Sequence, residues 1–286
     1  DLPAGGWYRL DALDHEASPG EEGGEDDGGD ERLRDFWTER LGLAADTSSE
    51  LAKALPFGAD GAIEDDGSLH YVSELIDSEL LRTLQVFGRR HGFAIETLVA
   101  AAWAVLMNRH TKARCSQFGV FGAGHRDIAP TLVPVRVRTV GRQKMLQWLR
   151  ELQTDLLRQH REALAPIERI REWAGHEPLF DTMVAFDHRV SVDGDGAADD
   201  ASQSQSSPLR PRFELVTAAT DDSLELTLIY RARTPDYEKA GALLEQFVVL
   251  LEGIVSNPDK MPSALGMRTR AESRERFWKT MEATTE

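Results

Sequence analysis

Cysteine is nearly absent from this sequence of 286 residues, which limits the covalent chemistry open to the chain. Cys115 is the one cysteine, so no disulfide can form within the chain. This composition fits a reducing compartment. Cys115 lies in the apolar segment CSQFGVFG, and no histidine is its obvious partner in the sequence. We therefore expect a buried, unreactive thiol rather than a nucleophile.

The motifs of metal, nucleotide and acyl-enzyme chemistry are also missing. None of the eight histidines is adjacent to another, and none lies in HExxH or at a spacing typical of zinc ligands. There is no GxSxG elbow, phosphate loop or GxGxxG turn. The segment Gly122-Ala123-Gly124 lacks the third glycine and the helix start that dinucleotide binding needs. We therefore predict no cofactor and no metal ligands.

Basic residues and long apolar runs are scarce as well. Lys and Arg number 33 against 49 Asp and Glu, which gives a net charge of −16. Nucleic acids and anionic membranes require a clustered basic face, so neither is an expected partner. No apolar run approaches the ~20 residues that span a bilayer, and no signal peptide opens the chain, so we expect a cytoplasmic protein. The first residue is Asp1 rather than Met, which indicates a piece of a longer chain.

Two segments have the composition of disordered linkers. Residues 14–30 read DHEASPGEEGGEDDGGD, and residues 189–209 hold DGDGAADDASQSQSSP. Segments with like charges, glycines and few apolar groups cannot bury a core, so we expect limited proteolysis to cut both first. The predicted organisation is an N-terminal arm and acidic linker at 1–30, one domain at 31–265, and an exit linker at 266–286.

Hydrophobic periodicity predicts alternating strands and helices. The expected strands are 69–75, 115–121, 132–139, 181–187, 213–219 and 224–231. The expected helices are 30–43, 77–91, 95–110, 142–161, 166–174 and 237–256. The predicted fold class is therefore α/β, with one mixed sheet of about six strands flanked by helices.

Some elements carry sharper expectations. Asp30 and Asp77 have the residue type and position of helix N-caps. The segment 95–110 is apolar on nearly every side, so it should be the most buried helix, with Trp103 in the core. HEPLFDTMVAFDH at 176–188 should contain a strand that is buried on both faces. Pro134 should place the strand at 132–139 near a sheet edge.

One loop contains a candidate catalytic pair. His125 and Asp127 follow a predicted strand, where a histidine and a carboxylate can form a general base. Residues so close together in one loop rarely orient one another. We therefore favour the alternative, a surface loop without a catalytic role. We expect no catalytic site in this domain, and His125 and Asp127 are the candidates if one exists.

Six segments, in their order along the chain, resemble a known family. They are FWTERL at 36–41, the run at 95–127 ending in FGAGHRD, TLVPVRVRT at 131–139, HREALAPIERIREWAG at 160–175, HEPLFDTMVAFDH, and RFELVTAA followed by LELTLIYRA at 212–232. Together they resemble the C-terminal lobe of nonribosomal peptide synthetase condensation domains. The resemblance covers about residues 31–282 and implies a single lobe of the chloramphenicol-acetyltransferase-like fold.

The chain departs from that family at two points. The family's catalytic HHxxxDG, which belongs to an N-terminal lobe, does not occur in this sequence. The family's GxFxNT segment, which supplies a loop closing the active-site tunnel, is also missing before TLVPVRVRT. Without these two segments, the chain resembles the reduced condensation-like domain that precedes the first adenylation domain in aminoadipyl-cysteinyl-valine synthetases. This resemblance implies a role in β-lactam antibiotic biosynthesis.

Three functional hypotheses remain open from the sequence. The first is a non-catalytic structural domain that supports an adjacent adenylation domain, with the carrier protein of the same synthetase as a further partner. The second is half of an active condensation domain whose catalytic lobe lies upstream of Asp1. The third is a module that recruits an enzyme acting in trans, with Arg136 and Arg138 near its docking surface.

Overall fold

A computed structural model of the chain describes its secondary structure in ten ranges. These are residues 27–42, 47–48, 68–122, 132–139, 141–162, 165–175, 179–187, 211–220, 222–232 and 236–268. The helices are α2 Asp27–Leu41, α4 Ser78–His91, α5 Ile95–Thr111, α6 Met145–Arg161, α7 Ile167–Ala174, α8 Tyr237–Ser256 and the 3-10 turn η3 Pro262–Ala264. The strands are β1 Thr47–Ser48, β2 Leu69–Leu75, β3 Cys115–Phe121, β4 Leu132–Arg138, β5 Thr182–Asp187, β6 Phe213–Ala219 and β7 Leu224–Arg231.

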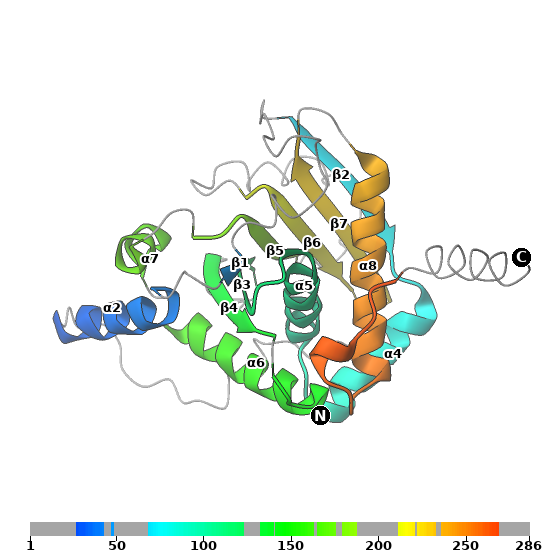
Figure 1. Ribbon diagram of the computed structural model, residues 1–286, viewed down its shortest axis with the longest axis horizontal. Helices are drawn as coiled ribbons and strands as arrows, with labels where there is room; N and C mark the ends of the chain where they lie inside the picture. The colour runs from blue at the N-terminus through cyan, green and yellow to red at the C-terminus, as the bar shows by residue number, and fades with distance from the viewer. Residues whose placement is uncertain are drawn as a thin grey trace, which may run out of the picture.

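The strands form one mixed sheet, as predicted (Figure 1). The hydrogen-bonded order is β1-β3-β5-β6-β7-β2, and β4 pairs with β3. The β3–β5 and β5–β6 pairs are parallel, whereas β3–β4, β6–β7 and β2–β7 are antiparallel. Within the described part of the chain β4 has β3 as its one neighbour, so Pro134 lies on an edge strand as expected.

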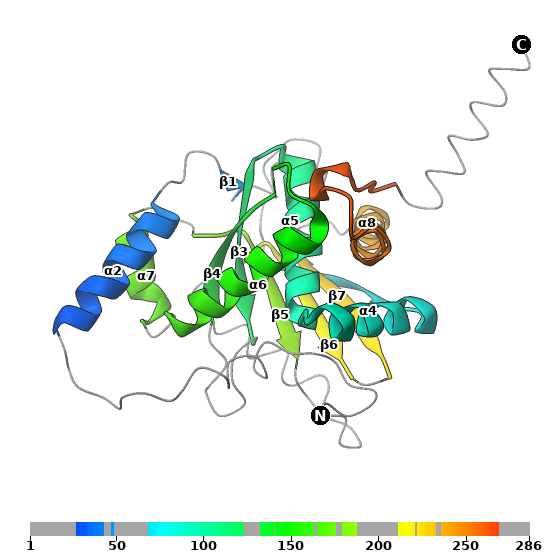
Figure 2. The same ribbon diagram turned by 90° about the horizontal axis from the view of Figure 1, so that it is seen from below.

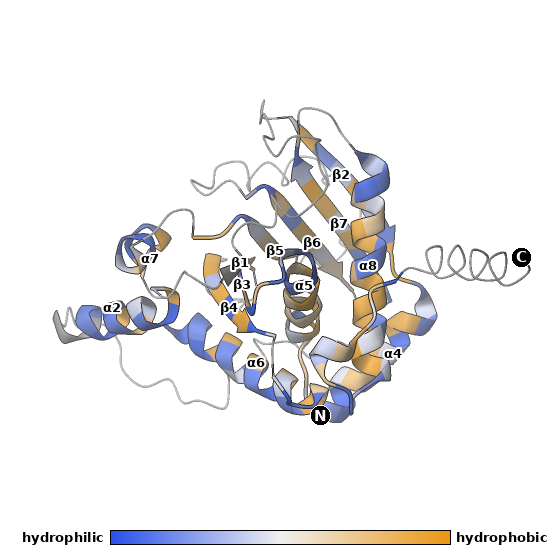
Figure 3. Cartoon of the chain, viewed as in Figure 1, coloured by the Kyte–Doolittle hydropathy of each residue, from blue (hydrophilic) through white to orange (hydrophobic). Residues whose placement is uncertain are grey.

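Helix α5 is the centre of the core. Thirteen consecutive residues, from Ile95 to Met107, are buried. The helix is apolar along its length in Figure 3 and is seen nearly end-on beside the sheet in Figure 1. Trp103 is 1% exposed, and its indole N–H donates to the Thr182 hydroxyl at 3.2 Å. The prediction that this is the most buried helix, with Trp103 in the core, is confirmed.

Local signals set the ends of α4. The Asp77 carboxylate accepts hydrogen bonds from the backbone N–H groups of Glu79 and Leu80 at 3.0 and 2.8 Å. Gly92 ends the helix in the left-handed conformation at φ 71°, which glycine adopts without a steric penalty. Both ends agree with the sequence prediction.

A second, smaller helical layer forms from α2 and α7, which lie side by side in both views (Figures 1 and 2). Trp37 is fully buried, and its indole N–H donates to the Glu162 carbonyl at 3.1 Å. The expected N-cap at Asp30 is wrong, because α2 begins at Asp27 and Asp30 pairs with Arg169 at 2.6 Å. The first four helical residues therefore fall in the segment predicted to be a linker.

Strand β5 lies inside the sheet and is covered on both sides. Met183 and Val184 point to opposite faces and are 4% and 0% exposed. Gly119 on β3 leaves room for the Phe180 ring, because a Cβ there would lie 2.7 Å from ring carbons. The prediction of a doubly buried strand in this segment is confirmed, with its first residue at Thr182.

The segment after α8 is held against the core. The first N–H groups of α6, from Met145 and Leu146, donate to the carbonyls of Lys260 and Pro258 at 2.8 and 3.4 Å. The Arg109 guanidinium donates to the carbonyls of Ser263 and Leu265. We call residues 257–268 the exit strap, since they continue the chain towards its C-terminal end.

No single helix in the described ranges is both long and apolar enough to cross a membrane. The helix pair α4–α5, which is bent by 110°, meets the length and composition criteria together.

Candidate functional site

The catalytic candidates His125 and Asp127 lie outside the described residues. Their loop joins β3 to β4, whose facing ends are Phe121 and Leu132. Gly122 begins the loop with φ 78°, a conformation that other residues rarely adopt. A catalytic role for either side chain stays a prediction.

The four histidines within the described ranges have structural contacts. The His70 Nε2 lies 2.9 Å from the Ala232 carbonyl, and the His160 Nδ1 lies 2.8 Å from the Leu156 carbonyl. Burial lowers the pKa of His110, while its hydrogen bond to Gln246 acts in the opposite direction. Burial, followed by the charges of Arg90 and Arg150, lowers the pKa of His91. No group of three metal-ligating side chains occurs within these ranges.

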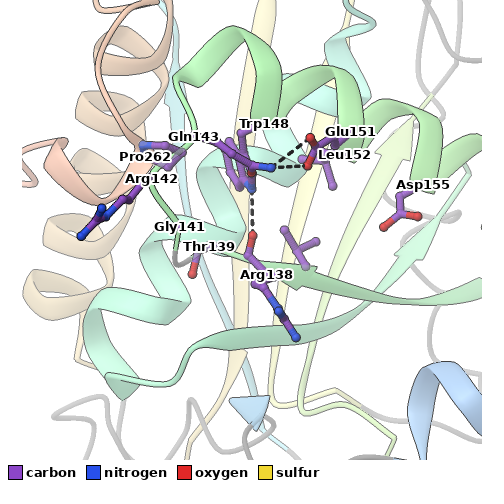
Figure 4. Close-up of a pocket in the computed structure, with 11 residues that line it drawn as sticks. Arg138, Thr139, Gly141, Arg142, Gln143, Trp148, Glu151, Leu152, Asp155 and Pro262 are labelled. Carbon is purple, nitrogen blue, oxygen red and sulfur yellow. Dashed lines mark hydrogen bonds between the residues drawn. The ribbon is translucent and has the colours of Figure 1, made fainter.

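One cavity lies between the end of β4 and α6 (Figure 4). Its volume is about 440 Å³. The lining residues include Arg138, Thr139, Arg142, Gln143, Trp148, Glu151, Leu152 and Asp155. It therefore contains cationic, anionic, amide and apolar groups, a mixture typical of a polar contact surface rather than of an apolar ligand pocket.

Most polar groups around this cavity are already engaged. The Gln143 amide donates to both Glu151 carboxylate oxygens at 2.9 and 2.8 Å, and the Trp148 indole N–H donates to the Arg138 carbonyl at 2.8 Å (Figure 4). The Thr139 hydroxyl is buried and finds no hydrogen-bond partner among the described residues. Arg138 is exposed, and its carbonyl faces the Trp148 indole at the cavity (Figure 4).

The two arginines considered for docking have different surroundings. Arg136 is half-buried, and its guanidinium donates to the Arg40 carbonyl at 3.0 Å, which ties β4 to α2. Arg138 is two residues further along β4 and is exposed at the cavity. The sequence therefore grouped a structural arginine with one that is accessible.

Glu214 is an unusual carboxyl that sequence reasoning did not identify. It lies on β6, facing away from the helices that bury Phe213 and Leu215. Burial raises the pKa of Glu214 to about 7, and the charge of Arg231 opposes this shift. The alternation of side chains along β6 predicts which face of the sheet Glu214 occupies. The extent to which its carboxyl is buried depends on the neighbouring strands.

This carboxyl should make stability depend on pH. Because the folded pKa lies above the ordinary 4.5, the folded chain keeps a proton that the unfolded chain releases between pH 4.5 and about 7. The free energy of unfolding should therefore fall as pH rises through that interval, by up to about 3 kcal/mol. Urea unfolding measures this free energy at each pH. The fall between pH 4.5 and about 7 should be missing in Glu214→Gln and present in Glu225→Gln, which changes an exposed position on β7. Equal slopes in all three proteins would contradict the assignment.

Comparison with known proteins places the chain in a family. The family model described as "Condensation domain" matches residues 27–275. One of the linear gramicidin synthase proteins of Brevibacillus parabrevis is 24% identical over 84% of this chain, and the nonribosomal peptide synthetase ungA of Aspergillus violaceofuscus is 25% identical over 75%. The chain spans only 3% and 2% of those two proteins.

Solved structures agree on the fold. The X-domain in its complex with OxyB from teicoplanin biosynthesis matches with a TM-score of 0.66 at 19% identity, over 85% of this chain and 57% of that one. The first condensation domain of the CDA synthetase matches with a TM-score of 0.65 at 14% identity, over 92% and 62%. The expected chloramphenicol-acetyltransferase-like lobe is thus confirmed, and the chain belongs to the condensation-domain family of nonribosomal peptide synthetases.

Proposed function

We propose that this chain is a non-catalytic condensation domain that supports an adjacent adenylation domain of the same synthetase. The observation that carries the proposal is the exit strap. Arg109 and the first N–H groups of α6 hold its carbonyls, and Leu265 is buried. A chain leaving towards a following domain is thereby attached to the lobe core, which gives a rigid support rather than a flexible tether.

Among the described residues no proton-transfer group is assembled, which supports the same proposal. Condensation needs a group that manages the proton of the attacking amine at about 3 Å. The sequence contains no HHxxxDG, and each histidine in the described ranges has one of the structural contacts given above or lies beside Phe87 and Phe93. Identity with the reduced domain of an aminoadipyl-cysteinyl-valine synthetase stays a prediction.

The decisive experiment compares two variants of the intact synthetase. The double variant His125→Ala/Asp127→Ala should leave peptide formation nearly unchanged, because the proposal gives these residues no proton to transfer. Deletion of residues 31–260 should reduce solubility or adenylation rate, since it removes the lobe and exposes the surface that it covers. Peptide formation and adenylation rate are measured side by side on both proteins.

Two controls make the outcome specific. Arg109→Met removes both hydrogen bonds to the exit strap and should lower the adenylation rate, whereas Arg82→Met, at an exposed position on α4, should not. A loss of about 10³-fold in the double alanine variant with adenylation intact would favour catalysis by this lobe together with one upstream.

A second candidate function is recruitment of an enzyme acting in trans. The observation that favours it is the fold similarity to an X-domain solved in complex with OxyB. On this chain the accessible Arg138 and the mixed-charge cavity beside it would form the docking surface. Full peptide formation and adenylation after deletion of residues 31–260, together with loss of a modification supplied by another enzyme, would select this candidate.

A further inference from the structure

Strand β2 forms an open edge of the sheet. It pairs with β7 residue for residue from Leu69–Arg231 to Leu75–Glu225, without a bulge. Within the described ranges no strand lies on its other side. Natural edge strands are usually protected by lysine, proline, a bulge or a covering element. The sequence LHYVSEL contains neither lysine nor proline, so the strand carries neither of these two protective residues.

The hydrogen-bond pattern shows which backbone groups face the open side. Just beyond β2, the Ile76 N–H donates to the Leu224 carbonyl at 2.9 Å. In an antiparallel ladder these bonds alternate, so every second residue before Ile76 directs its N–H and C=O to β7. The backbone groups of the remaining residues, Leu69, Tyr71, Ser73 and Leu75, therefore point to the open side.

The side chains of this strand also leave apolar surface uncovered. Leu69, Tyr71 and Leu75 are 41%, 69% and 66% exposed, and all three lie on the face of the sheet away from α8. The half-buried Ile229 of β7 lies beside Tyr71 and extends the apolar face. Together these four residues form an apolar strip along the open edge. Such a strip is typical of a surface that pairs with another strand.

The sequence of β2 is complementary to itself in one antiparallel register. If two copies pair about Val72, Leu69 lies opposite Leu75 of the second copy, and Tyr71 lies opposite Ser73. These are the residues whose backbone groups point outward, so both pairs can exchange N–H to carbonyl hydrogen bonds. His70 then lies opposite Glu74 on the other face, in the closer type of cross-strand pair.

The charges on that second face favour the same partner. Burial, followed by the charge of Glu245 on α8, raises the pKa of Glu74, so a cation placed beside this carboxyl would favour its charged form. His70 is the neighbouring ionisable residue on the same face of β2, and its ring is held by the Ala232 carbonyl and packs near Tyr230. A second copy would place one His70 beside each Glu74.

We propose that β2 pairs edge to edge with β2 of a second copy of this chain. The two strands run antiparallel about a two-fold axis at Val72, so the two sheets join into one. Two leucine pairs lie on one face and two histidine–glutamate pairs on the other, and the interface uses the same residues in both copies.

Sedimentation of the 286-residue chain across the micromolar range tests the proposal, and wild type should form a dimer in that range. Tyr71→Lys/Leu75→Lys should weaken the dimer by about tenfold or more, because it places charges on the apolar strip. Val86→Lys, at a 50% exposed position on α4, is the matched control and should leave dimerisation unchanged. Thermal unfolding of each variant confirms that it folds.

A charge exchange identifies the register. His70→Glu alone places two carboxylates opposite each other and should weaken the dimer, whereas His70→Glu combined with Glu74→Lys should restore it. A monomer at all concentrations would overturn the proposal. So would a dimer that Tyr71→Lys/Leu75→Lys leaves intact, since another surface would then hold the copies together. A single-variant defect that the exchange does not repair would overturn the register about Val72.

Discussion

Replacing Trp103 with alanine should lower the free energy of unfolding by about 3–5 kcal/mol. The indole is 1% exposed, packs edge-on against Phe247 at 6.1 Å between ring centroids, and donates to the Thr182 hydroxyl. Alanine would leave a large cavity between α5, α8 and β5, and the surrounding elements cannot close it without moving the sheet. It would also leave the buried Thr182 hydroxyl without its indole donor.

Urea unfolding followed by circular dichroism measures this loss. Trp103→Phe separates the two contributions, since it keeps an aromatic ring but removes the hydrogen bond, and it should cost less than alanine. Val86→Ala, at a half-exposed position on α4, should change stability by about 0.5 kcal/mol or less. A Trp103→Ala cost no larger than that of Val86→Ala would show that α5 is not the centre of the core.

The elements that could be predicted from the sequence are those with strong local signals. The segment IETLVAAAWAVLMNRH is apolar on every side, so its burial does not depend on knowing its neighbours. Asp77 and Gly92 mark both ends of α4 through their own backbone preferences. The alternation in LELTLIY, which only Ile229 interrupts, likewise predicts β7 and the face that it buries.

Features that depend on distant parts of the chain were missed. Asp30 has the residue type of an N-cap, but its carboxylate binds Arg169, which is 139 residues away. The two-residue strand β1 is too short for any periodic signal. The exit strap is held by Arg109 and α6, and no local pattern in residues 257–268 predicts these contacts.

The candidate site illustrates the same limit. Family resemblance led to the correct fold and family, yet the loop with His125 and Asp127 lies outside the described residues. Arg136 and Arg138 look equivalent in TLVPVRVRT, but one is tied to α2 and the other lines a cavity. The raised pKa of Glu214 and the open edge at β2 arise from strand order, which the sequence pattern does not specify.

Gly122→Ala should be about as destabilising as the loss of the Trp103 ring, although it adds only one methyl group. Gly122 has φ 78°, and a Cβ there would lie 2.4 Å from the Phe186 carbonyl oxygen. The backbone conformation alone costs a residue with a side chain about 1–3 kcal/mol. The contact adds about 1–3 kcal/mol more, because β3 or β5 must shift to relieve it.

Two other glycines separate these contributions. Gly92 has a similar φ of 71°, but a Cβ at that position would have nothing within 4 Å, so Gly92→Ala should show the conformational cost alone. Gly241, inside α8 with the same open space and no positive φ, should gain up to about 1 kcal/mol from alanine. Urea unfolding of the three variants should therefore rank Gly122→Ala as the most damaging and Gly241→Ala as stabilising. Equal costs at Gly122 and Gly92 would show that the Phe186 carbonyl is free to move, and that the exit from β3 into the loop of His125 is not fixed by β5.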